Sequence, residues 1–573
     1  MPVYNAEISR IFNEVADLLE IEGANEFRVR AYRDAARTID GYPRTMANMI
    51  EEGEDLTELP GIGDDLAGKI EEIVETGGLT QLDEIRSRTP PELADLLDIA
   101  GLGPKRVATL HEELGVTTEA DLRQVAEEGE IRELHGFGEK IEQKILDDLE
   151  RQGEEEEERT KLNVAEDAAQ PLVDYLQAGE GVERVEVAGS YRRRKETVGD
   201  LDILAISASR EEVIQHFTEY ENVAEVVSEG ETRSTVVLRS GLQVDLRVVE
   251  PESYGAALFY FTGSKAHNIA IRNIAIDQGL KVNEYGVFED EEQIAGETEE
   301  EIYDLFDLPY IAPGLREDRG EIAAARKGEL PHLIELADLR GDLQCHTTAS
   351  DGRNSLEEMA QAAQEMGHEY LAITDHSSYV SVTQGLEADE LAERIDEIQQ
   401  LDEEMEDIRL LTSIEVDVLE DGSLDLPGDV LDRLDVVIFS IHTKFDLPID
   451  EQTERIIRAM DNPHVHILAH PTGRRIGKRP GYQVDLERVM EAALERGCFL
   501  EINAQPERLD LDDVYAKRAK EMGLKVAIST DAHSTSELRV LRFGVYQARR
   551  GWLEPDDVLN ARSWNEAREL LKR

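Results

Sequence analysis

The chain has 573 residues, and 40% of them are hydrophobic, which is enough for several packed cores in a protein too long for one. No stretch approaches the roughly 18 uninterrupted apolar residues of a membrane span, and no basic segment followed by an apolar one opens the chain. The two cysteines, Cys345 and Cys498, cannot build a disulfide framework, so we expect a cytoplasmic protein.

The charge balance is strongly acidic, with 126 acidic and 61 basic residues and a net charge of -65. Such a surface repels nucleic acid, because binding to phosphates depends on cations of the protein. Either the partners are not polyanions, or the protein works in salt that shortens the Debye length to about 3 Å. The acidic residues are spread along the whole chain, which favours the second alternative and predicts a halophilic source.

Residues 1–150 are expected to form short amphipathic helices, such as 6–20 and 28–40, separated by turns that contain glycine. One turn pattern occurs three times, each time before a helical run, with glycines at Gly61 and Gly63, Gly101 and Gly103, and Gly136 and Gly138. Paired glycines let the backbone turn tightly and leave N–H groups at the start of the next helix, where a phosphate can bind. Three copies favour helix-hairpin-helix contacts to the DNA backbone over ordinary turns.

Residues 151–171 contain an acidic run with little periodicity and are predicted to be a helix end or linker. The region from 172 to about 320 is then predicted to mix helices and strands. Strands are expected at 182–188, 201–206, 235–239 and 242–249, and Ser240-Gly241 is a signal for a two-residue hairpin turn between the last two.

The pair Asp200 and Asp202 carries the chemistry of this region. Residues two apart on a strand point to the same face, so Leu201 between them points to the core. Carboxylates this close need a cation, and Asp245 on the expected hairpin is placed to be a third ligand. Arginines that follow Gly189-Ser190 can bind a triphosphate, so the pattern predicts nucleotidyl transfer with Mg²⁺ or Mn²⁺.

Short apolar strands alternate with helical runs over residues 339–573, and nearly every strand ends in a polar residue with ligand character. Such strand ends predict a (βα) barrel with its site on the carboxyl face of the strands. The strand ends are Gln344-Cys-His346, Thr374-Asp-His376, Ser413-Ile-Glu415, Ser440-Ile-His442, Leu468-Ala-His470, Glu501-Ile-Asn503 and Thr530-Asp531-Ala-His533.

The Asp200 region, with Tyr-Phe-Thr-Gly-Ser at 260–264 and Val-Asn-Glu-Tyr-Gly at 282–286, resembles the palm and thumb of family X DNA polymerases, the relatives of polymerase beta. The first 150 residues resemble the lyase and fingers domains of that family. The resemblance implies that Asp200, Asp202 and Asp245 hold two metal ions. It implies a nucleotide site formed by Gly189, Ser190, Arg193, Gly199, Tyr260, Phe261, Gly263, Asn268 and Arg272. Gln243 stands where these polymerases often carry an arginine.

Lys69 falls at the position of the Schiff-base lysine that removes deoxyribose phosphate in that family. Such a nucleophile must be partly deprotonated. Here the neighbours Asp64, Asp65, Glu71 and Glu72 favour the charged form, so a solvated or phosphate-contacting lysine is the competing interpretation.

Residues 339–573 resemble a PHP (polymerase and histidinol phosphatase) domain, a distorted seven-stranded barrel that holds up to three metals. The resemblance implies a bridging Glu415 and, as ligands of two to three Mn²⁺ or Zn²⁺ ions, His346, Asp351, His376, Glu415, His442, His470, Asp531 and His533. Gln344 stands where the family's His-x-His motif has its first histidine, which predicts weaker binding of one metal. Basic residues soon after His470 are candidate phosphate contacts: Arg474, Arg475, Lys478 and Arg479.

Together these resemblances cover the chain as a lyase-like domain at 1–85, fingers at 86–150, a linker at 151–171, a palm at 172–255, a thumb at 256–320, a linker at 321–338 and a PHP domain at 339–573. They imply a monomeric enzyme that fills short gaps in DNA repair, takes gapped or nicked DNA and dNTPs, binds no membrane and removes nucleotides from 3′ ends. Two alternatives stay open. One is chiefly a metal-dependent 3′-end nuclease or phosphoesterase, and the other is a DNA-end-binding scaffold with weak catalysis.

Overall fold

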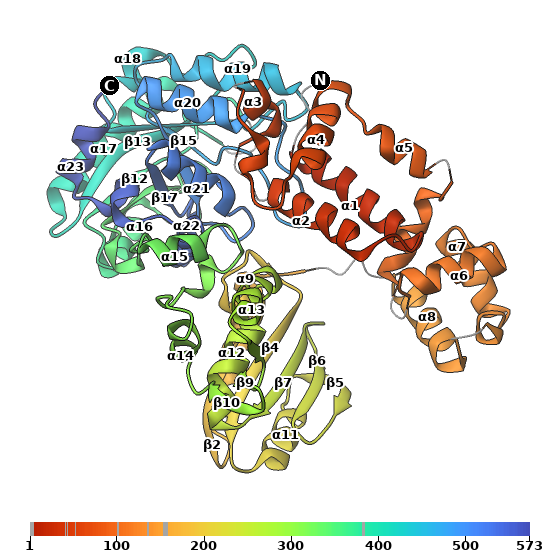
Figure 1. Ribbon diagram of the computed structural model, residues 1–573. Coiled ribbons are helices and arrows are strands. Elements are labelled where there is room, and N and C mark those ends of the chain that lie inside the picture. The colour runs from red at the N-terminus through yellow and green to blue at the C-terminus, as the bar shows by residue number, and fades with distance from the viewer. Residues whose placement is uncertain are drawn as a thin grey trace. The chain divides into compact units, whose positions relative to one another are not determined.

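The computed structural model (Figure 1) describes residues 5–40, 42, 44–51, 53–86, 88–99, 102–134, 137–152, 159–380 and 384–573. The chain forms two compact units, Met1–Glu158 and Arg159–Arg573. Within the described ranges, none of the helices combines the length and the apolar character that crossing a membrane requires.

The first unit is helical. Its helices are α1 (Asn5–Ile21), α2 (Glu26–Asp40), α3 (Met46–Glu51), α4 (Asp64–Thr76), α5 (Thr80–Arg86), α6 (Pro104–Leu114), α7 (Glu119–Glu127) and α8 (Glu139–Gln152). One apolar core joins them, and in it the rings of Phe12 and Tyr32 meet edge to face at 5.4 Å. The helices expected at 6–20 and 28–40 are therefore present as α1 and α2.

The second glycine of each repeated turn directly precedes a helix, as the pattern predicts. Gly63 precedes α4, Gly103 precedes α6 and Gly138 precedes α8. Gly61 has a φ of +79°, a backbone conformation that favours glycine. Gly101 and Gly136 lie outside the described residues.

A five-stranded sheet with the order β2-β4-β7-β6-β5 forms the first part of the second unit. Its strands are β2 (Val182–Val187), β4 (Asp200–Ser207), β5 (Val223–Glu229), β6 (Arg233–Leu238) and β7 (Gln243–Val249). Only the β4–β7 pair among these strands is parallel. Helices α9 (Leu162–Gln177) and α11 (Arg210–Thr218) share one core with Leu201 and Ile203 of β4. Leu204 packs instead with residues of α12 (Tyr254–Thr262) on the other face of the sheet. Asp200 and Asp202 lie on the same face as Leu204, because residues two apart on a strand point the same way.

Three details differ from the expected boundaries. Residues 162–171, expected in a linker, form the first half of α9, because apolar residues at helical spacing pack on the sheet and Pro171 faces solvent. Four residues, 239–242, separate β6 from β7 rather than two. Within this loop the Leu238 N–H donates to the Leu242 carbonyl, and Gly241 has a φ of +87°. Residues 321–327 of the second expected linker form helix α15 (Glu321–Lys327).

A smaller layer follows with α12, α13 (Lys265–Asp277), the three-stranded antiparallel sheet of β8 (Leu280–Asn283), β9 (Gly286–Glu289) and β10 (Glu292–Ala295), and α14 (Glu299–Asp304). Gly255 lets α12 pack directly on the backbone of Thr298, because an added Cβ would lie 2.2 Å from the Thr298 carbonyl carbon. Short elements connect the layers: β1 (Thr160–Lys161), α10 (Gly189–Arg192) and β3 (Thr197–Val198).

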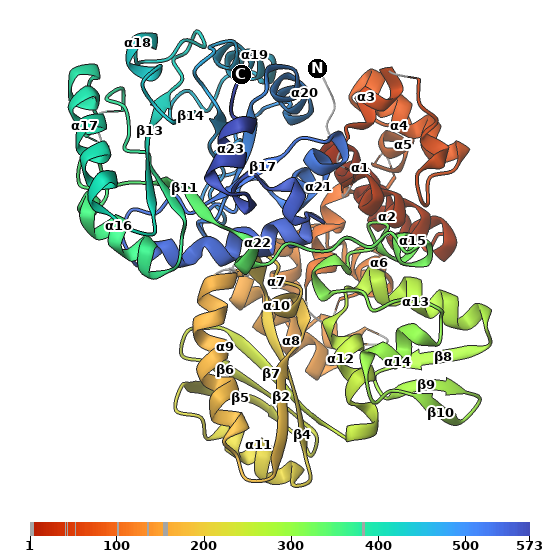
Figure 2. The same ribbon diagram turned by 90° about the vertical axis from the view of Figure 1, so that its left-hand side faces the viewer.

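Seven parallel strands in consecutive order form the last part of the second unit: β11 (Gly341–Cys345), β12 (Tyr370–Ile373), β13 (Arg409–Asp417), β14 (Val436–Ser440), β15 (Ile467–Leu468), β16 (Phe499–Asn503) and β17 (Val526–Ser529). The segment after β17 nearly closes the barrel, since the Asp531 N–H donates to the Gln344 carbonyl at 3.0 Å and the His346 N–H donates to the Ala532 carbonyl at 2.8 Å. Figure 2 shows the surrounding helices α16 (Leu356–Glu365), α17 (Ala388–Glu404), α18 (Gly428–Leu431), α19 (Ile449–Met460), α20 (Leu486–Arg496), α21 (Asp513–Met522), α22 (Leu541–Arg550) and α23 (Trp564–Leu570). The predicted (βα)₇ architecture is confirmed.

Candidate functional site: two metal-binding clusters

The first cluster, called the palm cluster below, lies on the five-stranded sheet, on the neighbouring parallel strands β4 and β7. Asp200 and Asp202 come from β4, and the strand register places Asp202 directly beside Asp245 of β7. One carboxylate oxygen from each residue lies within 4.8 Å of the others. Leu201 is fully buried on the opposite face, as the two-residue spacing predicts. Three converging carboxylates are a donor set that suits Mg²⁺ or Mn²⁺.

The electrostatics of this cluster favour a bound cation. Burial raises the pKa of Asp202 to about 7, and the nearby carboxylates of Asp200 and Asp245 contribute to the same rise. A divalent ion between the three carboxylates removes this repulsion.

Two residues that the sequence analysis missed hold Asp245 in place. Arg233 donates from Nη2 to both carboxylate oxygens of Asp245 at 3.2 and 3.3 Å, and the Thr235 hydroxyl donates to Oδ1. Both residues lie on β6, which pairs with β7 in a register that sets Thr235 opposite Asp245. Gln243 is exposed at the start of β7. Asp245 therefore has an arginine contact from the neighbouring strand, although Gln243 stands where the related polymerases often carry an arginine.

A glycine brings the expected triphosphate turn close to the carboxylates. Gly189 has a φ of +65°, and an added Cβ would lie 2.8 Å from Oδ2 of Asp202. Ser190 follows in α10. Arg193 donates to the carbonyl of Thr262 at 2.5 Å and to the carboxylate of Glu317 at 3.1 Å, so it links the turn after α10 to α12 and to the segment before α15.

The residues expected around the incoming sugar and base also meet in the structure. The rings of Tyr260 and Phe261 lie 5.1 Å apart, and the Arg272 guanidinium lies 5.2 Å from the centre of the Tyr260 ring. Asn268 donates to the Tyr260 carbonyl at 2.7 Å, while its buried Oδ1 has no partner within the described part of the chain. Gly263 ends α12 with a φ of +68°.

Lys69 lies in the first unit and forms an ion pair with Asp65 one turn earlier in α4. Its ammonium also lies 5.6 Å from the centre of the Tyr32 ring. Both contacts favour a cation. Around Gly63, Gly103 and Gly138 no described atom lies within 4 Å of an added Cβ, so these helix starts are open to a ligand.

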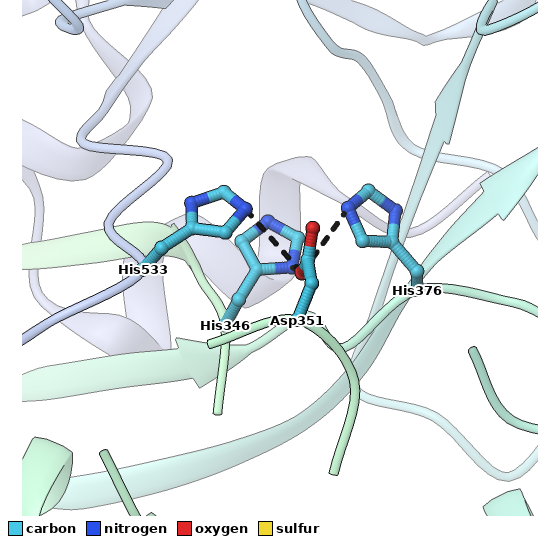
Figure 3. A group of neighbouring side chains, drawn as sticks. All are labelled: His346, Asp351, His376 and His533. Carbon is cyan, nitrogen blue, oxygen red and sulfur yellow. Dashed lines mark ion pairs between the residues drawn. The ribbon is translucent and has the colours of Figure 1, made fainter. Parts of the chain in front are cut away.

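The second cluster lies at the carboxyl ends of the barrel strands. Asp351, on the loop after β11, lies among three imidazoles (Figure 3), with Oδ1 3.4 Å from Nε2 of His533, 3.7 Å from Nε2 of His376 and 3.9 Å from Nδ1 of His346. These four residues form one candidate metal group. Their shared carboxylate and ring nitrogens are a mixed donor set of the kind that Zn²⁺ and Mn²⁺ accept.

Glu415, at the centre of the barrel mouth, belongs to two further groups, one with His376 and His442 and one with His346 and Asp531. Its Oε1 lies 3.0 Å from Nε2 of His470 and 3.3 Å from Nε2 of His442. Burial alone would raise the pKa of Glu415, yet the surrounding imidazoles hold it well below its usual value. This position between the groups is the one that a bridging carboxylate needs.

Several buried ring nitrogens around Glu415 have no hydrogen-bond partner among the described residues, namely Nδ1 of His346, His376 and His470. Unpartnered buried polar atoms are costly, and a metal ion satisfies them. The residues present therefore fit metal ions.

Gln344 faces the same cluster. Its Nε2 donates to Oε2 of Glu415 at 3.0 Å, and its buried Oε1 has no partner within the described ranges. An amide oxygen is a weaker ligand than an imidazole nitrogen for Zn²⁺.

Two acidic residues outside the expected ligand set support the barrel cluster. Oδ1 of Asp417 lies 2.9 Å from Nδ1 of His442 and orients that ring. Glu501 is fully buried, and burial together with Asp531 raises its pKa well above the usual value. The spacing Glu415-Val-Asp417 on one strand could have identified Asp417.

The basic residues after His470 are bound to other protein groups. Arg474 donates to Glu196 at 2.7 Å and to backbone carbonyls of residues 508 and 509. Arg475 and Lys478 both pair with Glu507. Arg479 lies over the Phe445 ring at 4.1 Å. These contacts stabilise the loop.

Profiles of known protein families match four parts of the chain. A DNA polymerase beta thumb profile matches residues 257–317, and a PHP domain profile matches residues 342–505. A helix-hairpin-helix domain profile matches residues 3–79, and a SAM-like helix-hairpin-helix tandem profile matches residues 93–151.

Curated relatives extend this comparison to the full chain. The barrel region is 32% identical over 242 residues to a probable phosphatase of Thermoanaerobacter sp., covering 40% of this chain and 94% of that one. The whole chain is 38% identical over 575 aligned positions to the DNA polymerase/3'-5' exonuclease PolX of Bacillus subtilis, covering 100% of both chains. The chain therefore belongs to the family X DNA polymerases with a C-terminal PHP domain.

Proposed function

We propose that this protein extends DNA primers by template-directed nucleotide addition and removes nucleotides from 3′ ends with its barrel. The observation that carries the polymerase is the palm cluster, in which Asp200, Asp202 and Asp245 converge beside a glycine-serine turn. The relative from Bacillus subtilis is named for both activities and matches over its full length.

In the polymerase reaction the three palm carboxylates would hold two Mg²⁺ or Mn²⁺ ions. Ions held there would lower the pKa of the primer 3′-hydroxyl and stabilise the leaving pyrophosphate. The chain's own part is to place the substrates. Ser190 and Arg193 receive the triphosphate, and Tyr260, Phe261, Asn268 and Arg272 border the sugar and the base. Arg233 and Thr235 keep Asp245 fixed so that the carboxylates need not reorganise during the reaction.

In the nuclease reaction the barrel cluster would hold two to three Mn²⁺ or Zn²⁺ ions, which activate water and bind the phosphodiester. Glu415, which belongs to two of the candidate groups, would be among the residues that hold them, and Asp417 orients His442. The amide at Gln344 weakens one corner, so we expect this activity to depend more steeply on metal concentration than polymerisation does.

The domains follow the two activities. We assign a lyase-like domain to residues 1–85, fingers to 86–150, a palm that begins with β1 and α9, a thumb to 256–320 and a PHP domain to 339–573. The substrates are gapped or nicked DNA and dNTPs, and the protein acts as a cytoplasmic monomer. Its three glycine turns would hold the DNA backbone.

The direct test is a gel of 5′-labelled primer in a one-nucleotide gap with dNTPs and Mg²⁺ or Mn²⁺. Extension should be lost in Asp200→Ala and kept in His442→Ala, and shortening should show the reverse. Shortening without any extension would favour the alternative of a 3′-end nuclease. A primer that is bound but unchanged would favour a DNA-end-binding scaffold.

The net charge of -65 requires a further condition. We propose that the protein works in concentrated salt, as in a halophilic archaeon, where screening suppresses its repulsion from DNA. DNA binding should then strengthen as KCl first rises, in contrast to the usual weakening by salt. Binding that falls steadily from low salt to high would contradict this proposal.

A further inference from the structure

A polar cavity of about 450 Å³ lies within the second unit, where the palm turn at 195–197 meets helices α21 and α22 of the barrel. None of its lining residues belongs to the palm cluster or to the barrel cluster. The lining residues are Arg159, Lys195, Glu196, Thr197, Arg474, Asp512, Asp513, Gln547 and Arg550.

Most charges in this cavity neutralise one another. Arg474 pairs with Glu196 at 2.7 Å, and Arg550 pairs with Asp513 at 2.5 Å. Arg319 also pairs with Asp513, at 2.9 Å. Asp512 caps α21 by accepting from the Tyr515 N–H, and burial raises the pKa of Asp512 to about 6.

Three hydrogen-bond donors remain without a carboxylate that accepts from them among the described residues. The Lys195 ammonium lines the cavity and makes no hydrogen bond or ion pair with the described part of the chain. Burial lowers the pKa of Lys195, and the more distant carboxylates of Glu317 and Asp513 oppose this shift. Gln547 is 2% exposed, and its Nε2 has no hydrogen-bond partner within the described ranges. Arg159 donates only to the hydroxyl and carbonyl of Thr197, at 2.9 and 3.0 Å.

Lys195, Gln547 and Arg159 line the same cavity with donors that no carboxylate accepts from, and an acceptor-rich anion would satisfy all three. We propose that this cavity binds a small phosphate anion, either orthophosphate or pyrophosphate, through Lys195, Gln547 and Arg159. Phosphate oxygens accept several hydrogen bonds at once and satisfy donors of all three kinds. The proposal is independent of the two metal clusters and adds a site to them.

The walls of the cavity connect it to the polymerase turn. Arg550 donates from Nη1 to the Arg193 carbonyl at 2.9 Å and to the Glu317 carboxylate at 3.0 Å. Glu317 also accepts from the side chain of Arg193. Arg550 therefore links the cavity to Arg193, the arginine that is expected to bind the incoming triphosphate.

The test is calorimetric titration of the full-length protein with sodium orthophosphate and, separately, sodium pyrophosphate, at constant KCl and with EDTA to remove divalent metals. We expect one anion per chain, and about tenfold weaker binding in Lys195→Gln, because one charge-assisted hydrogen bond is lost. Gln547→Leu should weaken binding several-fold. Lys195→Arg should keep it, which separates loss of the cation from loss of folding.

Two matched controls locate the site. Lys161→Gln removes a half-buried lysine that pairs with Glu507 outside the cavity, and it should leave the affinity unchanged. Ser190→Ala alters the expected triphosphate turn and should also leave it unchanged. Binding lost in Ser190→Ala but kept in Lys195→Gln would overturn the proposal, as would no binding of either anion. Tighter binding of pyrophosphate would identify the leaving group of nucleotidyl transfer as the source, and tighter binding of orthophosphate would identify free phosphate.

Discussion

Replacing Asp202 with asparagine should stabilise the metal-free protein while it abolishes polymerisation. Asp202 has its pKa raised to about 7 from an ordinary value of 3.8, through burial and then through Asp200 and Asp245. The folded state therefore binds this proton more tightly than the unfolded state does. The stability that this bound proton contributes is fully present below pH 3.8 and is lost as the pH rises to about 7.

The size of the effect follows from the difference between the two pKa values. At about 1.36 kcal/mol per pKa unit, keeping Asp202 ionised in the folded state costs about 4 kcal/mol of stability, and solvent screening at this half-buried site reduces that cost to about 2 kcal/mol. The amide of the substituted side chain carries no charge and can donate a hydrogen bond to a neighbouring carboxylate. We expect Asp202→Asn to gain about 2 kcal/mol at pH 8 and less than half as much at pH 5.

Urea unfolding in EDTA, followed by circular dichroism, measures this gain, and hydrogen exchange of β4 assigns it to the palm. Asp167→Asn on α9 is the matched control, because Asp167 lies outside the cluster. Added Mg²⁺ should stabilise the wild type and have little effect on Asp202→Asn. A variant that is equally stable at both pH values, or less stable than the wild type at pH 8, would refute the electrostatic account of the cluster.

Three further experiments test Gln344 of the barrel cluster, Arg233 beside the palm cluster and Lys69 of the first unit. Gln344→His should raise the metal content by about one ion per chain, because an imidazole can offer a ligand nitrogen where Oε1 of Gln344 has no partner among the described residues. Mass spectrometry of the purified protein measures the metal content, and an unchanged content would contradict the expectation. Arg233→Gln should lower kcat for one-nucleotide gap filling about tenfold with little change in KM for dNTP, since Asp245 loses a charge-assisted contact; an unchanged kcat would mean that Thr235 alone fixes Asp245. Borohydride reduction with incised abasic DNA should trap no adduct on Lys69, because Asp65 pairs with its ammonium; an adduct that disappears in Lys69→Ala would show a lyase.

Local spacing predicts much of this protein. Asp200 and Asp202 face one side because strand residues alternate, and the barrel ligands follow their strands in order. The same two-residue argument applies to Asp417, which the sequence analysis missed. The first half of helix α9 is hard to tell from a linker in the sequence, because it follows an acidic run and contains Pro171, whereas its apolar face packs on the sheet.

Contacts between distant segments cannot be predicted in this way. Arg233 reaches Asp245 only through the register of β6 against β7, which the hairpin loop sets. The cavity around Lys195 exists only because Gln547 and Arg550, more than three hundred residues later in the chain, pack beside the palm turn. No periodicity or motif in the sequence predicts the packing of these two residues beside the palm turn.

The central claim is that two separate metal clusters in one chain act in opposite directions on the same primer end. Conversion of labelled dNTP to dNMP on gapped DNA measures both, because a nucleotide must be added before it is removed. We predict dNMP formation by the wild type, none by Asp200→Ala or His442→Ala alone, and recovery when the two variants are mixed. Undiminished dNMP formation by His442→Ala, or none by a wild type that extends the primer, would contradict the claim.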